Sequence, residues 1–259
     1  MSKENIISKN ELKDFLLNLT KERTLVIPVD TGKVVEYQKV IDINETNTLL
    51  DDRVSYKSIK EFYFPQTELM FTFNGDEVTD HTEMPGFVIF GARPCDLEAL
   101  KVMSVVYTTG KYADPFFKRR FDANLLIGIG CKERKPECFC DEMGIDKENS
   151  DFCDIFLIDV DDSYEVKFTS EKGKNNLASF CDTIYDNALS PVSLCDTTPS
   201  PCLALDIEKE DSAYFDIIDW KIVTETCKGC GICTYVCPTC YCFDFKDISN
   251  KNTAKRYKC

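Results

Sequence analysis

The stretch Cys227-Lys-Gly-Cys230-Gly-Ile-Cys233-Thr-Tyr-Val-Cys237-Pro238 spaces its cysteines as C-x2-C-x2-C-x3-C-P. This spacing is typical of short loops whose thiolates ligate cubane iron–sulfur clusters. Thiolates two residues apart can converge on three irons of one cube, and the interposed glycines let backbone N–H groups approach the inorganic sulfides. We therefore predict a [4Fe–4S] cluster at this loop, which we call the cluster motif (residues 227–238).

A structural zinc site is the alternative interpretation of the cluster motif. Structural zinc is usually bound by two separated C-x2–4-C pairs or by cysteine and histidine pairs. Four cysteines in one run, closed by a proline, fit the iron–sulfur spacing better. The chain has a single histidine, His81, so a two-histidine metal site within it is excluded. His81 stands in a polar segment that we expect to be a solvated loop without a functional role.

Composition indicates a soluble globular protein of 259 residues, long enough for one large domain or two ordinary ones. The net charge of −14 argues against nucleic acid or an anionic membrane surface as a partner. The apolar runs are too short to span a bilayer, and the N-terminus lacks the layout of a signal peptide. We therefore expect a cytoplasmic location without membrane insertion.

The chain contains 15 cysteines. Without an export signal, so many cysteines indicate metal or cluster ligation in a reducing compartment rather than a disulfide framework. No G-x-G-x-x-G follows a predicted strand, because Gly128-Ile-Gly130 runs directly into Cys131. A Rossmann-type cofactor site in this chain is therefore not expected.

The order of predicted elements indicates an α/β (or α+β) layer domain over residues 1–190. A helix is expected after the capping-box sequence Ser8-Lys-Asn-Glu11, and another over residues 97–107. A further helix is expected over residues 174–189. Strands are predicted at residues 24–29, 87–91, 124–130, 154–160 and 164–169.

A segment rich in Pro, Ser and Thr begins at Ser190 and favours a linker over residues 191–210. The remainder, residues 211–259, is predicted to be a small ferredoxin-type module of helix and loop. Within it, a helix over residues 211–225 is expected to deliver the chain to the cluster motif.

A second group of cysteines follows the predicted strands of the first domain. Ligands of open α/β sheets collect at the carboxyl ends of strands, so these thiols could hold a further [4Fe–4S] cluster. Their spacing is not a standard one, and burial as small side chains is the alternative. We call them the strand-end cysteines: Cys95, Cys131, Cys138 and Cys140. Four others are assigned to packing: Cys153, Cys181, Cys195 and Cys202.

Three strings in this order resemble one protein family over most of the chain: GARPCDLEAL at 91–100, Cys131 with the CFC that ends at Cys140, and CKGCGICTYVCPTCYCFDF at 227–245. The family is that of the iron–sulfur electron-transfer subunits typified by the sulfhydrogenase beta subunit and the corresponding iron–sulfur subunit of anaerobic sulfite reductase. The resemblance implies a cytoplasmic subunit that relays electrons. Flavin- and NAD(P)H-binding partners would lie on one side, and a catalytic subunit of hydrogenase or sulfite-reductase type on the other.

The sequence departs from the family at its end. Such subunits usually carry a second ferredoxin-type motif, and none follows before Cys259, so either this end holds one cube or the sequence is cropped. If there is one cube, Cys237 or Cys259 must complete it, and we expect Cys237. Cys240 and Cys242 remain candidate ligands of a second cluster.

The predicted function is therefore a relay of single electrons, with no bond-making chemistry in this chain. Two other interpretations compete with it. In one, an exposed cluster or redox-active cysteine acts directly on a small substrate. In the other, the cysteines hold zinc in a scaffold without redox function.

Overall fold

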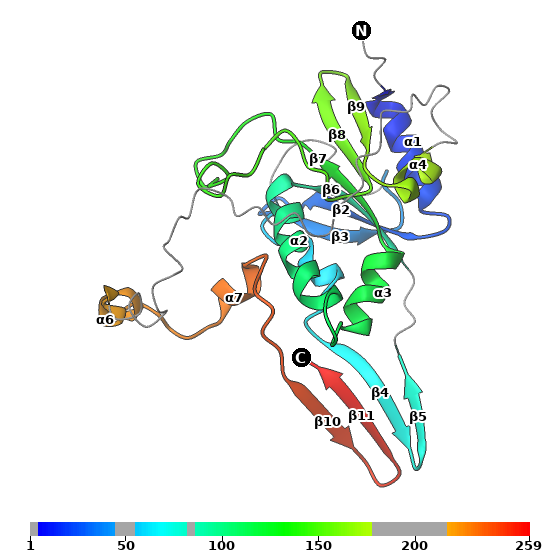
Figure 1. Cartoon of the computed structure of the whole chain (residues 1–259). Coiled ribbons are helices and arrows are strands. Elements are labelled where there is room, and N and C mark those ends of the chain that lie inside the picture. Colours follow the sequence, from blue (N-terminus) through cyan, green and yellow to red (C-terminus); the bar gives the residue numbers. More distant parts are fainter. Residues whose placement is uncertain (1–4, 45–54, 82–85, 178–216) are drawn as a thin grey trace.

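A seven-stranded mixed sheet forms the centre of the computed structural model, which describes residues 5–44, 55–81, 86–177 and 217–259. Its strand order is β1-β9-β8-β7-β6-β2-β3 (Figure 1). Strands β2, β6, β7 and β8 are parallel, and the other three pair antiparallel. The strands are β1 (Ile6–Ser8), β2 (Thr24–Asp30), β3 (Val35–Val40), β6 (Phe87–Ala92), β7 (Leu125–Ile129), β8 (Ile155–Val160) and β9 (Ser163–Phe168).

Helices cover both faces of this sheet, which confirms the predicted α/β class. One hydrophobic cluster joins the sheet to α1 (Lys9–Leu19) and α4 (Glu171–Leu177). The other joins it to the 3₁₀ helix η1 (Ile59–Phe62), α2 (Pro94–Thr108) and α3 (Pro115–Ala123). The side of the sheet that carries η1 and α2 also carries the candidate site. Within the described residues, no helix combines the length and apolar character needed to cross a membrane.

The local signals read from the sequence account for the first helix. The Ser8 hydroxyl accepts a hydrogen bond from the Glu11 amide at 3.2 Å, and the Glu11 carboxylate accepts one from the Ser8 amide at 2.8 Å. This reciprocal capping box satisfies two amides that the first turn would otherwise leave unpaired. The helix then buries the predicted face of Leu12, Phe15, Leu16 and Leu19.

Helix α2 packs unusually close to the sheet because Gly128 has no side chain. A Cβ atom at Gly128 would lie 2.8 Å from Phe156 Cδ2 and 2.9 Å from Leu97 Cδ1. Leu97 belongs to the first turn of α2, so this approach holds the amino end of the helix, where Cys95 lies, against β7.

A second, four-stranded antiparallel sheet was not predicted. Its order is β10-β11-β4-β5, and its strands are β4 (Glu68–Asn74), β5 (Glu77–Asp80), β10 (Phe245–Ser249) and β11 (Thr253–Lys258). Strand β11 pairs with β4, which lies about 180 residues earlier in the sequence (Figure 1). Residues 245–258 are therefore a hairpin that shares a sheet with the first part of the chain, in place of the predicted helix and loop.

Several predicted boundaries shift. Strand β3, which lies outside the predicted strand ranges, is an edge strand that buries Tyr37 and Val40. The helix predicted at 174–189 begins earlier, as α4, and residues beyond 177 lie outside those described. Helix α6 (Trp220–Thr224) is shorter than the predicted helix over 211–225, of which residues 211–216 are also not described. The predicted linker, 191–210, lies outside the described residues as well.

Buried charges fasten the terminal hairpin to the first part of the chain. Glu68 on β4 forms ion pairs with Arg120 on α3 and, at 3.1 Å, with Lys258 at the end of β11. All three side chains are at most 5% exposed. The Lys258 ammonium also lies 4.4 Å from the centre of the Phe64 ring. One carboxylate thus neutralises two buried cations from separate elements.

We expect Glu68→Gln to lower the free energy of unfolding by about 3–5 kcal/mol, because it removes the counter-charge of buried Arg120 and leaves buried Lys258 with the more distant carboxylate of Asp114, at 3.8 Å. Urea denaturation under anaerobic conditions measures the change. Glu77→Gln on the exposed strand β5 is the matched control, with an expected change of about 0.5 kcal/mol or less. Equal midpoints for the two variants would contradict the role given to Glu68.

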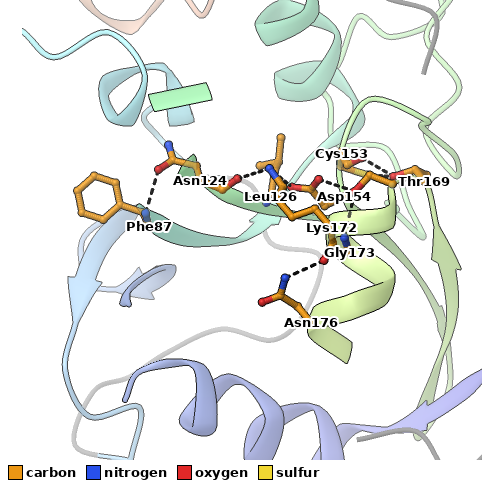
Figure 2. Close-up of polar contacts among 10 residues, drawn as sticks. Phe87, Asn124, Leu126, Cys153, Asp154, Thr169, Lys172, Gly173 and Asn176 are labelled. Atoms are coloured by element: carbon orange, nitrogen blue, oxygen red, sulfur yellow. Dashed lines mark hydrogen bonds and ion pairs between the residues drawn. The ribbon is translucent and has the colours of Figure 1, made fainter. Parts of the chain in front are cut away.

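Asp154 organises the amino ends of β7 and β8 (Figure 2). Its carboxylate accepts hydrogen bonds from the Leu126 amide at 2.8 Å and the Ser170 hydroxyl at 2.6 Å, and it pairs with Lys172 at 3.1 Å. Lys172 also donates to the Asn124 carbonyl at 2.6 Å. These contacts hold strand register at the edge opposite the strand-end cysteines, so we assign them to the fold.

Candidate metal centres

The cluster motif begins as an open loop and continues into the short helix α7 (Ile232–Val236), which lies within it. The thiols of Cys227, Cys230 and Cys233 are exposed. Gly229 and Gly231 have φ angles of +64° and +74°, and a Cβ atom at either would meet nothing within 4 Å. The Gly229 amide donates to Cys227 Sγ at 3.4 Å. Left-handed glycines and an amide aimed at sulfur are the features expected of a loop that wraps an iron–sulfur cluster.

Cys237 ends α7 and is directed toward the residues that follow it. Its partial burial would raise the pKa of the thiol, but hydrogen bonds with Cys240 and Thr239 outweigh this and lower the pKa to about 7. Cys237 Sγ lies 3.4 Å from Thr239 Oγ1. A thiol with this pKa is substantially ionised near neutral pH, which is the form that binds metal.

Cys259, the alternative fourth ligand, lines a cavity of about 400 Å³ between η1 and α7. Mutual backbone hydrogen bonds of 2.9 Å between Cys259 and Asp244 hold it at the base of the hairpin. Cys240 and Cys242 line the same cavity. The structure therefore places Cys240, Cys242 and Cys259 around one space, and Cys237 beside Cys240.

Lys60 of η1 fastens the cluster motif to the α/β layers. Its ammonium group donates to the backbone carbonyls of Thr234 at 3.1 Å, Cys237 at 2.6 Å and Cys240 at 2.9 Å. Neighbouring Lys57 lies 5.7 Å from the centre of the Tyr235 ring on α7. Sequence reasoning missed both lysines, because nothing near residue 60 indicates contact with residues about 175 positions later.

The strand-end cysteines gather at the carboxyl edge of the parallel strands, as predicted. Cys95 lies in the first turn of α2, directly after β6, and Cys131 follows β7, the next strand of the sheet. Cys138 and Cys140 lie in the loop after Cys131. The Lys135 amide donates to Cys138 Sγ at 3.4 Å.

The charges of these thiols influence one another. Burial raises the pKa of Cys95 to about 12, and the negative charges of Asp96, Cys140 and Cys131 add to this effect. Burial also raises the pKa of Cys140, with Cys138 contributing as a like charge. Mutually repelling thiolates at a helix amino terminus are a donor set that bound iron would stabilise.

Among the described residues, no three histidine, cysteine or acidic side chains converge closely enough to hold a single metal ion. Ligands of a cubane cluster lie farther apart, since each thiolate binds a different iron. Each cysteine group has a set of thiols and one amide directed at sulfur that suit such a cluster, and the cluster motif adds an open glycine backbone. Cys153, by contrast, is buried in the hydrophobic cluster beneath α2, as the packing assignment predicted.

One short segment lies near both cysteine groups. The Ser58 hydroxyl accepts a hydrogen bond from the Lys60 amide at 3.3 Å, and it lies close enough to the carboxylate of Asp96, the residue after Cys95, to influence its pKa. Burial raises the pKa of Asp96 to about 6, although Ser58 and Arg93 oppose this. Residues 58–60 therefore extend from the strand-end cysteines to the cluster motif.

Comparisons with known proteins place the chain in a family. No protein-family model matches the sequence, and no solved structure shows significant similarity to it. The sulfhydrogenase 2 subunit beta of Pyrococcus furiosus is 30% identical over 230 residues, which cover 85% of this chain and 67% of that protein. Identity at this level over most of both chains confirms the resemblance read from the three cysteine-bearing strings. The chain belongs to the sulfhydrogenase beta subunit family.

Proposed function

We propose that this protein is an electron-transfer subunit of a cytoplasmic, hydrogenase-type oxidoreductase complex. Its relative is named as the beta subunit of a sulfhydrogenase, which supports membership of a complex with other redox subunits. The proposed ligands of the terminal cluster are Cys227, Cys230, Cys233 and Cys237. Those of the second cluster are Cys95, Cys131, Cys138 and Cys140.

The observation that carries the relay is the connection made by residues 58–60. Ser58 lies close to the neighbour of Cys95, and Lys60 contacts the backbone of Cys237. Electron tunnelling falls steeply with distance, so two centres held at the ends of one short segment are suited to exchange electrons. A bound cluster would accept and donate one electron at a time. The chain's own residues hold the thiolates, supply amide donors to sulfur and shape the local charge.

The proposed partners are a flavoprotein or NAD(P)H-binding subunit and a catalytic subunit. The net charge of −14 disfavours nucleic acid and suits docking against basic surfaces of other subunits. An acidic chain also lowers cluster potentials, which suits a low-potential donor such as NAD(P)H or ferredoxin.

We expect anaerobically purified protein to be brown, to contain about eight irons per chain and to give an EPR signal on reduction with dithionite. Iron, sulfide and zinc analysis, absorbance near about 400 nm and EPR measure this directly. Colourless protein loaded with zinc would refute the relay. Turnover of sulfite, protons or sulfur by the isolated chain with reduced dyes would instead make it an enzyme in its own right.

A further inference from the structure

Lys60 is held in a way that a surface lysine is not. Its ammonium group meets three carbonyl oxygens within 3.1 Å, from the last turn of α7 and from the turn that follows. Two of these carbonyls belong to Cys237 and Cys240. Among the described residues, no carboxylate lies within ion-pairing distance of Lys60. Within this part of the chain, its positive charge therefore faces backbone carbonyls of residues 234, 237 and 240 rather than a carboxylate.

The geometry suits a positioning role for two reasons. The carbonyls of Thr234 and Cys237 stand at the carboxyl end of α7, where helix carbonyls lack partners inside the helix and carry partial negative charge. Lys60 satisfies them and fixes the backbone that carries the Cys237 thiol. Helix η1, which supplies Lys60, packs Ile59 and Phe62 into the hydrophobic cluster beneath α2, so the anchor is rigid.

We propose that Lys60 is a positioning residue of the terminal cluster: it holds the backbone of Cys237 and Cys240, and its charge raises the reduction potential of that cluster. This inference rests on the proposed function. A reduced cluster carries one more negative charge than the oxidised one, so a fixed nearby cation favours reduction. Residues that orient metal ligands from behind affect metal affinity as well as position.

Lys60→Met tests the proposal because it keeps much of the side-chain length and removes the charge. We expect the midpoint potential of the terminal cluster, followed by EPR in a redox titration, to shift to more negative values. Loss of iron to a chelator should become about tenfold faster, in line with the cost of losing a residue that supports a metal ligand. Lys60→Arg keeps the charge and should retain a potential near that of the unchanged protein.

Lys118→Met is the matched control. Lys118 is an exposed lysine of α3 that pairs with Asp122 at 3.1 Å, so its loss removes the same charge away from the cysteine backbone. Its loss should leave the potential and the rate of iron loss near their original values. Circular dichroism on each variant separates a local effect from misfolding, and Lys60→Gln, which also removes the charge, carries the test if Lys60→Met does not fold.

The outcomes distinguish this inference from the function on which it rests. If the protein without substitutions contained no iron, the proposed electron relay itself would be refuted. Iron-loaded Lys60→Met with the original potential and chelator resistance would overturn the role of Lys60 and leave the relay standing. An equal shift in Lys118→Met would also overturn it, because the effect would then come from overall charge.

Discussion

Cys230→Ser should abolish the terminal cluster and with it electron transfer through the C-terminal part of the chain. Cys230 is the middle cysteine of the C-x2-C-x2-C run, and its exposed thiol lies between the two left-handed glycines. A serine hydroxyl is a far weaker iron ligand than a thiolate, so we expect loss of about four irons per chain. Iron and sulfide analysis and EPR after anaerobic purification measure it.

Cys153→Ser provides the control for Cys230→Ser. Cys153 is buried, and its thiol lies 4.0 Å from the Ser150 carbonyl oxygen and 3.9 Å from Thr169 Oγ1. A hydroxyl at this position finds hydrogen-bond partners, so the variant should fold and keep its full iron content. If Cys230→Ser kept its full iron content, or if both variants lost the same amount of iron, the cluster motif would not be a cluster site.

The central sheet could be predicted because its signals are local. The runs that form β6, β7 and β8 are short, apolar and followed by turn residues, which is typical of parallel strands buried on both faces. The Ser8 capping box and the apolar face of α1 could likewise be predicted from the sequence. In each case a few adjacent residues carried the information.

The second sheet could not be predicted for the opposite reason. Strand β11 reads Thr-Ala-Lys-Arg-Tyr-Lys, a polar sequence whose stability as a strand depends on pairing with β4. The buried Lys258 contradicts the usual expectation for lysine and is explained by two carboxylates from remote parts of the chain, Glu68 and Asp114. Long-range pairing of this kind leaves no mark on the residues next to it.

The candidate site divides in the same way. Motif spacing indicated the thiols of the cluster motif, which lie on one tight loop, and the ends of predicted strands indicated the strand-end cysteines. Lys60 and Ser58 act across the tertiary structure, and a lysine in a mixed, charged segment is ordinarily a solvated residue. The roles of Lys60 and Ser58 therefore depend on the tertiary structure, which places η1 beside both cysteine groups.

The strand-end cysteines offer the second large effect. We expect the double variant Cys95→Ser, Cys138→Ser to lose about four irons while the terminal cluster keeps its EPR signal. Cys95 and Cys138 come from different elements, one at the start of α2 and one in the loop after Cys131, yet both are coupled in charge to Cys140. Thiols that repel one another when ionised are stabilised by cluster iron, so removal of two of them should prevent assembly.

Two measurements decide whether that site is a cluster or only a group of partly buried thiols. Unchanged iron in the double variant would leave the cluster motif as the sole metal centre and would make burial the correct account of Cys95. Loss of both EPR signals would mean that the terminal cluster depends on the strand-end site, through Ser58 and Lys60, for its assembly. Selective loss of one signal, with the fold intact by circular dichroism, requires two separate centres.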